Sequence, residues 1–563
     1  MDGVSAFTNN VAGFIWGGTW GDATIIPGNI GPLAIVLLGT GLFMMVRLGA
    51  RPLRRFAPAL AEVWQGRKSQ GEDGAITPWQ ALSTALSGQV GTGNLAGVAT
   101  AITLGGPGSI FWMWVVAIFG MALAFSESSL AIKYRETDEN GRINGGPMYY
   151  IKNGLGKGWG WLAVIFCLGT LFSAMATGSM IQANSIAEAA KETASSVGVS
   201  IPGWGIGIVL GALVFAVIVG GIKSIGSFAG KVVPVMAGLY VLIAFCVLVA
   251  NADKVPAAFM QIITYAFGLE QAAGGAAGYG VMQAVRYGIA RGLFSNEAGQ
   301  GSAPIAHAAA QTKSPVMQGE IAMIGVFIDT VIICTMTALV ILTVQGDFKK
   351  SPALMAAQTC EATGFAVPDG ASIDDLFPSA YADGREAVIA ESGQTAAAWL
   401  EACRASGVGV SDVAIASAAD ADVLMDVAHA WETDASSAAV TTRAYGAAFP
   451  GGQWIVPIAL FFFAFTTIIG WSYYGEQAVT YLIGERATMP FRYAWVLVVF
   501  SGTLVSADWV WQLGDIANAS MAFPNLIAIA ALSGVVVAMH RDPNGGAVNE
   551  EGASAPAKPA AEG

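Results

Sequence analysis

The chain has 563 residues, of which 54% are hydrophobic and 12% charged, and its mean hydropathy is +0.58. This composition is typical of a membrane protein, and the length allows about eleven spans of roughly 20 apolar residues each. The formal net charge of −12 argues against nucleic-acid binding. The three histidines are scattered and the five cysteines lack metal-site spacing, so we expect no transition-metal site.

Residues 1–26 lack the basic start of a cleavable signal and carry two tryptophans suited to a membrane interface. We expect a first helix at about 27–48, followed by a basic loop. The next apolar run, about 78–104, is interrupted by Ser-Gly-Gln-Val-Gly-Thr-Gly-Asn at 87–94. Its three glycines weaken a helix, and hydrocarbon tolerates such a break only where free backbone groups line a protected cavity. Further spans are expected at about 109–133, 159–189, 203–222 and 229–250.

A polar, glycine-rich stretch at 251–279 precedes a second broken run at about 280–310. Its interruption reads Phe-Ser-Asn-Glu-Ala-Gly-Gln-Gly-Ser-Ala-Pro at 294–304. After a span at about 319–345, residues 346–448 form an acidic, alanine-rich insertion of soluble composition. We expect three last spans at about 453–483, 491–507 and 513–540, and a disordered tail at 541–563.

Lysine and arginine gather in alternate loops, near 47–68, 133–157, 223–231, 313 and 486–492. By the positive-inside rule these loops are cytoplasmic, which predicts a multi-pass inner (plasma) membrane protein with its amino terminus outside and its carboxyl terminus inside. The 346–448 insertion is then extracytoplasmic, where Cys360 and Cys403 either form a disulfide or stay free. After the first helix, the spans form two five-helix units, 78–250 and 280–540. Because five is odd, the second unit is inverted, and the two breaks should meet near the midplane.

The first break offers both donors and acceptors to a small zwitterion. Backbone N–H groups of Gly91, Thr92 and Gly93 can bind a carboxylate, or these glycines only permit tight packing. Asn94 offers a carbonyl oxygen to a sodium ion or a substrate ammonium, or else bonds to a neighbouring helix. Sodium is a hard cation that prefers oxygen ligands, and the nearest further candidates are Ser87, Gln89 and Val90 through its backbone oxygen.

The second break supplies a cap and further oxygens. Phe294 can cover a small side chain of the substrate, and Ser295 and Asn296 offer oxygens to the substrate or a cation. Asp329 lies about ten residues into the next span, roughly 15 Å deep at about 1.5 Å per residue. It can complete a sodium site with Ser295 or Asn94.

Glu297 is an intramembrane carboxylate, which is energetically costly and by default a functional hypothesis. It either acts in coupling, by binding an ammonium group or a cation, or pairs with Arg286 or Arg291 as a structural latch. A proton-coupled mechanism would use Glu297 or Asp329. A channel would need a pore-lining repeat or a charged ring, and an enzyme a nucleophile–base pair, and the sequence offers neither.

Several motifs resemble the sodium:alanine (or glycine) symporter family: Gly-Gln-Val-Gly-Thr-Gly-Asn-Leu-Ala-Gly-Val-Ala at 88–99, Gly-Gly-Pro-Gly with Phe-Trp-Met-Trp at 105–114, Asn-Gly-Gly-Pro-Met-Tyr-Tyr-Ile at 144–151, and the interruption at 294–304. The resemblance implies an all-α leucine-transporter-type fold, with one extra helix before a ten-helix core. It also implies alternating-access import of alanine or glycine with Na+ as the coupling ion and no organic cofactor. The oligomeric state stays open.

The resemblance further implies which side chains line the pocket. It implies that Gln182 touches the substrate, and Ser179, three residues earlier, shares its helix face; the alternative is a helix–helix hydrogen bond. Thr467 and Trp471 would close the pocket, the indole leaving little room for large side chains. Thr466 is a further candidate sodium ligand, together with carbonyls near Val90.

Overall fold

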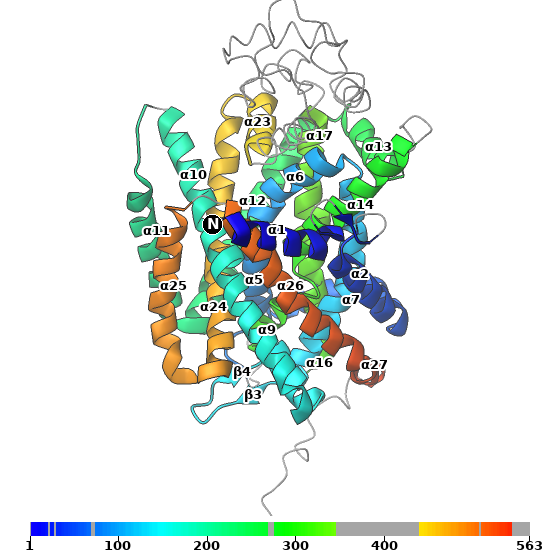
Figure 1. Ribbon diagram of the computed structural model, residues 1–563, viewed down its shortest axis with the longest axis vertical. Helices are drawn as coiled ribbons and strands as arrows, with labels where there is room; N and C mark the ends of the chain where they lie inside the picture. Colours follow the sequence, from blue (N-terminus) through cyan, green and yellow to red (C-terminus); the bar gives the residue numbers. More distant parts are fainter. Residues whose placement is uncertain are drawn as a thin grey trace, which may run out of the picture.

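The computed structural model describes residues 2–20, 23–26, 30–68, 74–196, 198–267, 275–312, 314–344, 438–505 and 508–542. These residues form a bundle of helices with two short hairpins (Figure 1), β1 (Thr19–Trp20) with β2 (Ala23–Thr24) and β3 (Glu136–Thr137) with β4 (Ile143–Asn144). Cys360, Cys403, nearly all of the insertion and nearly all of the tail lie outside the described residues.

Long apolar helices make the chain a membrane-integral, polytopic helical protein. Within the described residues, five helical segments are long and apolar enough to span a membrane, and the bent pair Ile516–Ala531 and Ser533–Arg541 would add a sixth. This is fewer than eleven because the first broken run is divided and several other helices are short. The five are Ser109–Lys133, Gly160–Lys191, Gly221–Ala250, Pro315–Val344 and Gly452–Ile483.

The amino-terminal part contains a helix where the sequence indicated only interfacial anchors. Helix α1 (Asp2–Gly17) lies across the bundle and packs against α2 (Pro32–Arg47) and α26 (Figure 1). Gly31 permits this contact, because a Cβ there would lie 2.1 Å from the carbonyl oxygen of Ile15. Two short helices, α3 (Arg51–Arg54) and α4 (Phe56–Gln65), then lead to the first broken run.

The first broken run has the expected interruption. A capping box between Thr77 and Gln80 starts α5, and the run ends at Gly105. The following helices overlap the predicted spans, although the one expected at 229–250 begins at Gly221 and the one expected at 159–189 extends to Ser196. The elements are α5 (Pro78–Gln89), η1 (Thr92–Asn94), α6 (Ala96–Gly105), α7 (Ser109–Lys133), α8 (Pro147–Gly154), η2 (Lys157–Trp159), α9 (Gly160–Ser173), the π-helical η3 (Ala174–Met180), α10 (Ile181–Ser196), α11 (Gly203–Ile218) and α12 (Gly221–Ala250).

The second half corrects two predicted boundaries. The stretch 251–279 contains an apolar helix, α13, and the end of the predicted insertion forms α23, whose Thr441 Oγ1 donates to the Leu95 carbonyl at 3.0 Å. The elements are α13 (Val255–Ala266), α14 (Gly275–Asn296), α15 (Ala303–Ala308), α16 (Pro315–Val326), the π-helical η4 (Phe327–Cys334), α17 (Thr335–Val344), α23 (Ala438–Ala448), η7 (Gly452–Trp454), α24 (Ile455–Ile483), η8 (Glu485–Ala487), α25 (Thr488–Gly502), α26 (Asp508–Ala531) and α27 (Ser533–Arg541).

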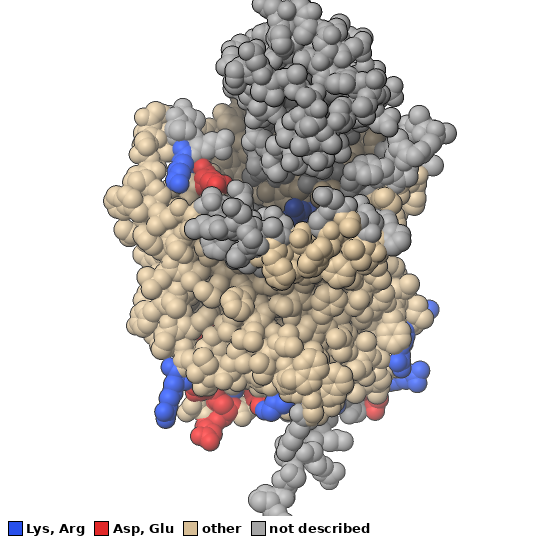
Figure 2. Space-filling view, viewed as in Figure 1, with Lys and Arg blue, Asp and Glu red and all other residues tan. Residues whose placement is uncertain are grey.

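Charged side chains are distributed unevenly over the surface. On the face shown in Figure 2, the described residues form a broad belt without Lys, Arg, Asp or Glu, and most visible charges gather at the end that holds the β3–β4 hairpin and α27. Such a belt suits the bilayer core, where charge is costly. The charged end contains the loops predicted to be cytoplasmic, and the orientation itself remains a prediction.

Candidate functional site

The two interruptions lie side by side in the middle of the bundle, as the sequence predicted. The Gln89 side-chain amide donates to the backbone oxygen of Asn296 at 2.8 Å, and the Asn94 amide donates to Ser295 Oγ at 3.1 Å. All four residues are buried. The structure thus brings main-chain groups and polar side chains of both breaks into one site.

Glycine is required in the first break because neighbouring side chains approach it closely. A Cβ on Gly91 would lie 2.7 Å from Thr467 Oγ1. The Gly91 N–H donates to Asn94 Oδ1 at 2.9 Å, and the Thr92 N–H donates to Gln182 Oε1 at 3.4 Å. Side-chain carbonyls therefore hold two of the amides that we expected to bind a carboxylate.

The second break contains a left-handed backbone turn. Glu297 has φ +56°, rare for a residue with a side chain, and Gly299 and Gly301 follow at +81° and +90°. The Glu297 carboxylate accepts hydrogen bonds from Ser302 Oγ at 2.6 Å and Trp471 Nε1 at 2.9 Å. Each oxygen of the Glu297 carboxylate therefore accepts a hydrogen bond from a neutral donor. One candidate for the latch, Arg286, has its guanidinium next to Gly17 of α1.

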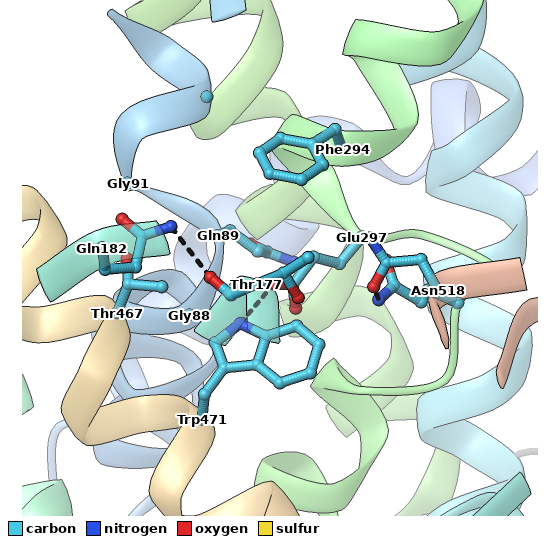
Figure 3. Close-up of a pocket in the computed structure, with 12 residues that line it drawn as sticks. Gly88, Gln89, Gly91, Thr177, Gln182, Phe294, Glu297, Thr467, Trp471 and Asn518 are labelled. Atoms are coloured by element: carbon cyan, nitrogen blue, oxygen red, sulfur yellow. Dashed lines mark hydrogen bonds between the residues drawn. The ribbon is translucent and has the colours of Figure 1, made fainter. Parts of the chain in front are cut away.

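A small pocket lies between the two breaks (Figure 3). Its free volume of about 20 Å³ is enough for about one water molecule, so a larger ligand would have to displace side chains that now fill it. In Figure 3 the Trp471 indole lies on one side of Glu297 and the Phe294 ring on the other. The lining residues predicted from the sequence are Gln89, Gly91, Gly93, Gln182, Phe294, Glu297, Thr467 and Trp471.

Gln182 makes the helix–helix hydrogen bond that was one of its two predicted roles, and it also lines the pocket. Its amide nitrogen bonds to Thr92 Oγ1 at 3.2 Å and to the Thr177 carbonyl at 3.1 Å. The helix–helix hydrogen bond is thus present in this conformation. It is also one of the contacts that a ligand at the Thr92 amide would exchange.

A second polar cluster lies beside the pocket and contains Asp329. Its carboxylate accepts from the Asn94 amide at 2.7 Å, from Ser295 Oγ at 2.5 Å and from Thr330 Oγ1 at 2.8 Å. Asn296 joins through a 3.1 Å bond from its amide to Thr330 Oγ1. This buried carboxylate with hydroxyl oxygens is the donor set that a hard monovalent cation such as sodium prefers. Among the described residues, no cluster of His, Cys, Asp or Glu fits a transition metal.

Three predicted site residues, Thr466, Ser179 and Ser87, lie outside both the pocket and the polar cluster around Asp329. Thr466 Oγ1 donates to the Phe463 carbonyl and faces Met236, whereas Thr467 Oγ1 donates to the Val90 carbonyl at 3.3 Å. The Val90 carbonyl therefore bonds to Thr467 and not to the predicted Thr466.

Ser179 and Ser87 are the other two. Ser179 is buried but does not line the pocket, and Thr177 does. The cause is the π-helical η3, whose wider turn shifts the face that α-helical spacing predicts. Ser87 Oγ donates back to the Thr84 carbonyl at 2.7 Å, and its oxygen lies against Gly470 of α24. It supports the contact between α5 and α24.

Sequence reasoning missed a buried support behind the second break. Glu127 of α7 accepts from the Gly299 N–H at 3.4 Å and from the Asn525 amide at 2.7 Å. That amide also donates to the Gly299 carbonyl at 2.9 Å, and Tyr150 donates to Asn525 Oδ1. Glu127 was visible in the sequence as a carboxylate within a predicted span.

The pocket also contains lining residues that the sequence did not single out. Gln300 donates through Nε2 to Asn518 Oδ1 at 2.8 Å, and Ser173 donates to the same oxygen at 2.5 Å. Glutamine and asparagine are common in loops and helices alike, so their position alone gave no signal. The missed lining residues are Gly88, Thr177, Gln300 and Asn518.

A family model described as the sodium:alanine symporter family matches residues 24–372 and 398–551. The chain belongs to the sodium:alanine symporter family. The sodium/alanine symporter AgcS of Methanococcus maripaludis is 38% identical over 95% of this chain and 96% of that protein. An uncharacterized transporter of Haemophilus influenzae is 37% identical over 96% of each. Bacillus subtilis has a relative named "Putative sodium/proton-dependent alanine carrier protein YrbD", 34% identical over 89% of this chain and 87% of that protein. The family is one of membrane transporters, and both interruptions lie within the matched residues.

Proposed function

We propose that this protein is a sodium-coupled symporter that imports alanine, glycine or both by alternating access. The observation that carries the proposal is the juxtaposition of a polar pocket, lined by both helix breaks and by the carboxylate of Glu297, and the oxygen cluster around Asp329. The two share Asn94, which bonds to the Gly91 N–H on the pocket side and to Asp329 on the other. A cation at the cluster and a zwitterion in the pocket would therefore act on the same side chain.

In this proposal the substrate carboxylate binds the backbone N–H groups of Gly91, Thr92 and Gly93, replacing the carbonyls that now hold two of them. The ammonium group binds toward the Glu297 carboxylate, where Trp471 and Ser302 now donate. Phe294 and Trp471 then enclose the side chain of the substrate. The sodium ion binds Asp329 and Ser295, with Asn94, Asn296 and Thr330 in the same hydrogen-bonded cluster.

We assign the chain a leucine-transporter-type fold, with eleven transmembrane helices in which α2 precedes a five-plus-five inverted repeat. The two helix breaks, about two hundred residues apart in the sequence and adjacent in space, support this assignment. The amino terminus is assigned to the outside and the carboxyl terminus to the cytoplasm of the inner (plasma) membrane, from the positions of the basic loops.

Uptake of labelled alanine into liposomes tests the proposal. Purified protein should accumulate labelled alanine when a sodium gradient is applied and should not do so with potassium. A competition panel of glycine, both enantiomers of alanine, serine, leucine and glutamine then defines the substrate. Passive sodium conduction without alanine accumulation would contradict the proposal.

Proton coupling is the second candidate function, and two observations support it. Glu297 and Asp329 are buried carboxylates within the site, and the YrbD relative carries sodium/proton-dependent in its name. Alanine accumulation driven by a pH gradient in sodium-free buffer would support this candidate over sodium coupling.

The size of the pocket is tested at Trp471. A Cβ on Gly178 would lie 2.5 Å from two atoms of Trp471, so the indole is held in place by this close contact and by its bond to Glu297. Trp471→Ala should admit larger amino acids such as leucine as competitors, because the indole no longer limits the space. An unchanged competition profile would remove Trp471 from the role of size filter.

A further inference from the structure

A groove of about 650 Å³ lies on the outside of the bundle, apart from the pocket and lined almost wholly by carbon. Helices α3, α4, α7 and α13 and the π-helical η4 form its walls. We call it the lateral groove and define it by Leu53 and Phe56 at one end, Trp114 and Phe259 at the other, and Phe327 and Val331 along its floor.

The chemistry of the lateral groove suits a hydrocarbon chain. The indole N–H of Trp114 donates to Thr335 Oγ1 at 2.8 Å, so the groove's two polar groups satisfy each other. The rings of Trp114 and Phe259 stack with centroids 5.4 Å apart, and Phe56 meets Phe327 edge to face at 4.6 Å. Burying such a surface against an acyl chain is favourable, whereas a polar ligand would find no partner in it.

Positive charge lies at one end of the lateral groove. Leu53 is followed directly by the exposed Arg54, whereas the next residue, Arg55, is paired with the carboxylates of Glu62 and Glu320. The adjoining helix α4 exposes 47% of Leu60 and 67% of Trp64, the pattern of a helix that lies in the membrane interface. This end is therefore at headgroup level, and its charge complements an anionic headgroup.

The floor of the lateral groove is the same π-helical segment that carries Asp329. Phe327 and Val331 line the groove, while Asp329 and Thr330 between them are buried and belong to the polar cluster around Asp329. A chain seated in the groove thus packs against one face of η4, and the carboxylate and hydroxyl of the cluster lie on its other face.

We propose that the lateral groove binds one anionic phospholipid of the cytoplasmic leaflet, with its headgroup at Arg54 and an acyl chain along Phe327 and Val331. The lipid supports the π-helical conformation of η4 from outside and so helps to position Asp329. This role goes beyond the proposed transport function, and its binding step can be measured without alanine or sodium.

Native mass spectrometry of the detergent-purified protein, with phosphatidylglycerol or phosphatidylcholine added, tests the proposal. Wild-type protein should retain one phosphatidylglycerol. Ile118→Trp, which fills the groove from α7, should abolish this retention, whereas Leu239→Trp on the exposed face of α12 should not. Equal retention by the Ile118→Trp protein, or a homodimer that this variant dissociates, would overturn the proposal.

The headgroup is tested separately and without change to the groove. Arg54→Gln should lower the preference for phosphatidylglycerol over phosphatidylcholine about fivefold, the usual effect of one cation near a membrane surface. Arg486→Gln is the matched control, since Arg486 is an exposed arginine of the α24–α25 connection. An unchanged preference in the Arg54→Gln protein would overturn the assignment to an anionic lipid, even if Ile118→Trp failed to fold.

Discussion

The two helix breaks meet at one site but are held open by different chemistry. In the first break the free amides of Gly91 and Thr92 are held by the neutral side chains of Asn94 and Gln182. In the second break the acceptors are two carboxylates. Glu297 accepts hydrogen bonds from Ser302 and Trp471, and Glu127 accepts them from the Gly299 N–H and the Asn525 amide.

Under the proposed function, this difference gives the two breaks different tasks. A neutral amide can exchange a backbone N–H for a ligand carboxylate without leaving a buried charge, because it gives up only a hydrogen bond. A buried carboxylate that loses its donors is left charged and unsolvated, which costs several kcal/mol unless a cation or proton replaces them. The first break is therefore suited to recognising the substrate, and the second to responding to positive charge.

The largest expected effect comes from removing a carboxylate of the second break. Glu297→Ala deletes the acceptor of two hydrogen bonds to a charged group, each worth about 1.5–3 kcal/mol. Alanine uptake in liposomes should fall at least about a hundredfold. The control Glu297→Gln keeps an oxygen for the Trp471 indole and should retain more activity than Glu297→Ala. Equal activity in the two variants would show that the hydrogen bonds to Glu297 do not matter.

Asn94→Ala should have the next largest effect, because Asn94 links the two breaks. It removes bonds to the Gly91 N–H, Ser295 and Asp329, so the affinities for alanine and for sodium should both fall, by about ten- to a hundredfold. Gln182→Ala, which touches only the pocket side, should reduce alanine affinity and leave the sodium dependence nearly unchanged. Calorimetry on folded, purified variants measures both affinities, and wild-type values for Asn94→Ala would remove it from the site.

Gly91→Ala sharpens the comparison by changing the first break alone. The added Cβ would lie 2.7 Å from Thr467 Oγ1 and 3.3 Å from Gln182 Oε1, so these side chains must shift into the pocket. Alanine affinity should fall about tenfold, the effect of roughly 1.4 kcal/mol. Gly238→Ala on α12 is the matched control, because a Cβ there meets nothing within 4 Å. Similar losses in both variants would point to a general helix effect and away from the pocket.

The smallest effect is expected at Glu62, a carboxylate of α4 outside the breaks. Burial, followed by its hydrogen bond with Glu320, raises the pKa of Glu62 to about 8. Because the folded protein disfavours the charged form, this carboxyl costs stability as the pH rises from about 4.5 to about 8. The cost stays under about 1 kcal/mol, since Glu62 is partly exposed and screened by solvent. Glu62→Gln should unfold at a slightly higher temperature than the wild type at pH 9 and at the same temperature at pH 4.

Thermal unfolding across this pH range measures the effect, and the comparison with Glu297→Gln separates the two regions. The transport of the Glu62→Gln protein should keep its wild-type pH profile, because Glu62 lies away from both breaks. A shifted profile would connect the α4 region to the coupling step and weaken the division of tasks between the breaks.

The sequence alone determined the helical membrane class, both interruptions and their meeting. Glycines clustered at Gly88, Gly91 and Gly93 disfavour a helix wherever they stand, and an apolar run needs no tertiary information to predict a buried or membrane-embedded helix. The predicted inversion of the second unit implied that the breaks meet, and Gln89 and Asn296 are in contact in the structure. The family was readable from the same motifs.

The tertiary structure decided which side chain of each neighbouring pair reaches the site. The π-helical η3 places Thr177 in the pocket where α-helical spacing favoured Ser179. Thr467 bonds to the Val90 carbonyl, near which the sequence predicted Thr466. One residue of helical phase rotates a side chain by about 100°, and only packing against a neighbour fixes that phase. The support of Gly299 by Glu127 and Asn525 likewise joins residues hundreds of positions apart, which local propensity cannot specify.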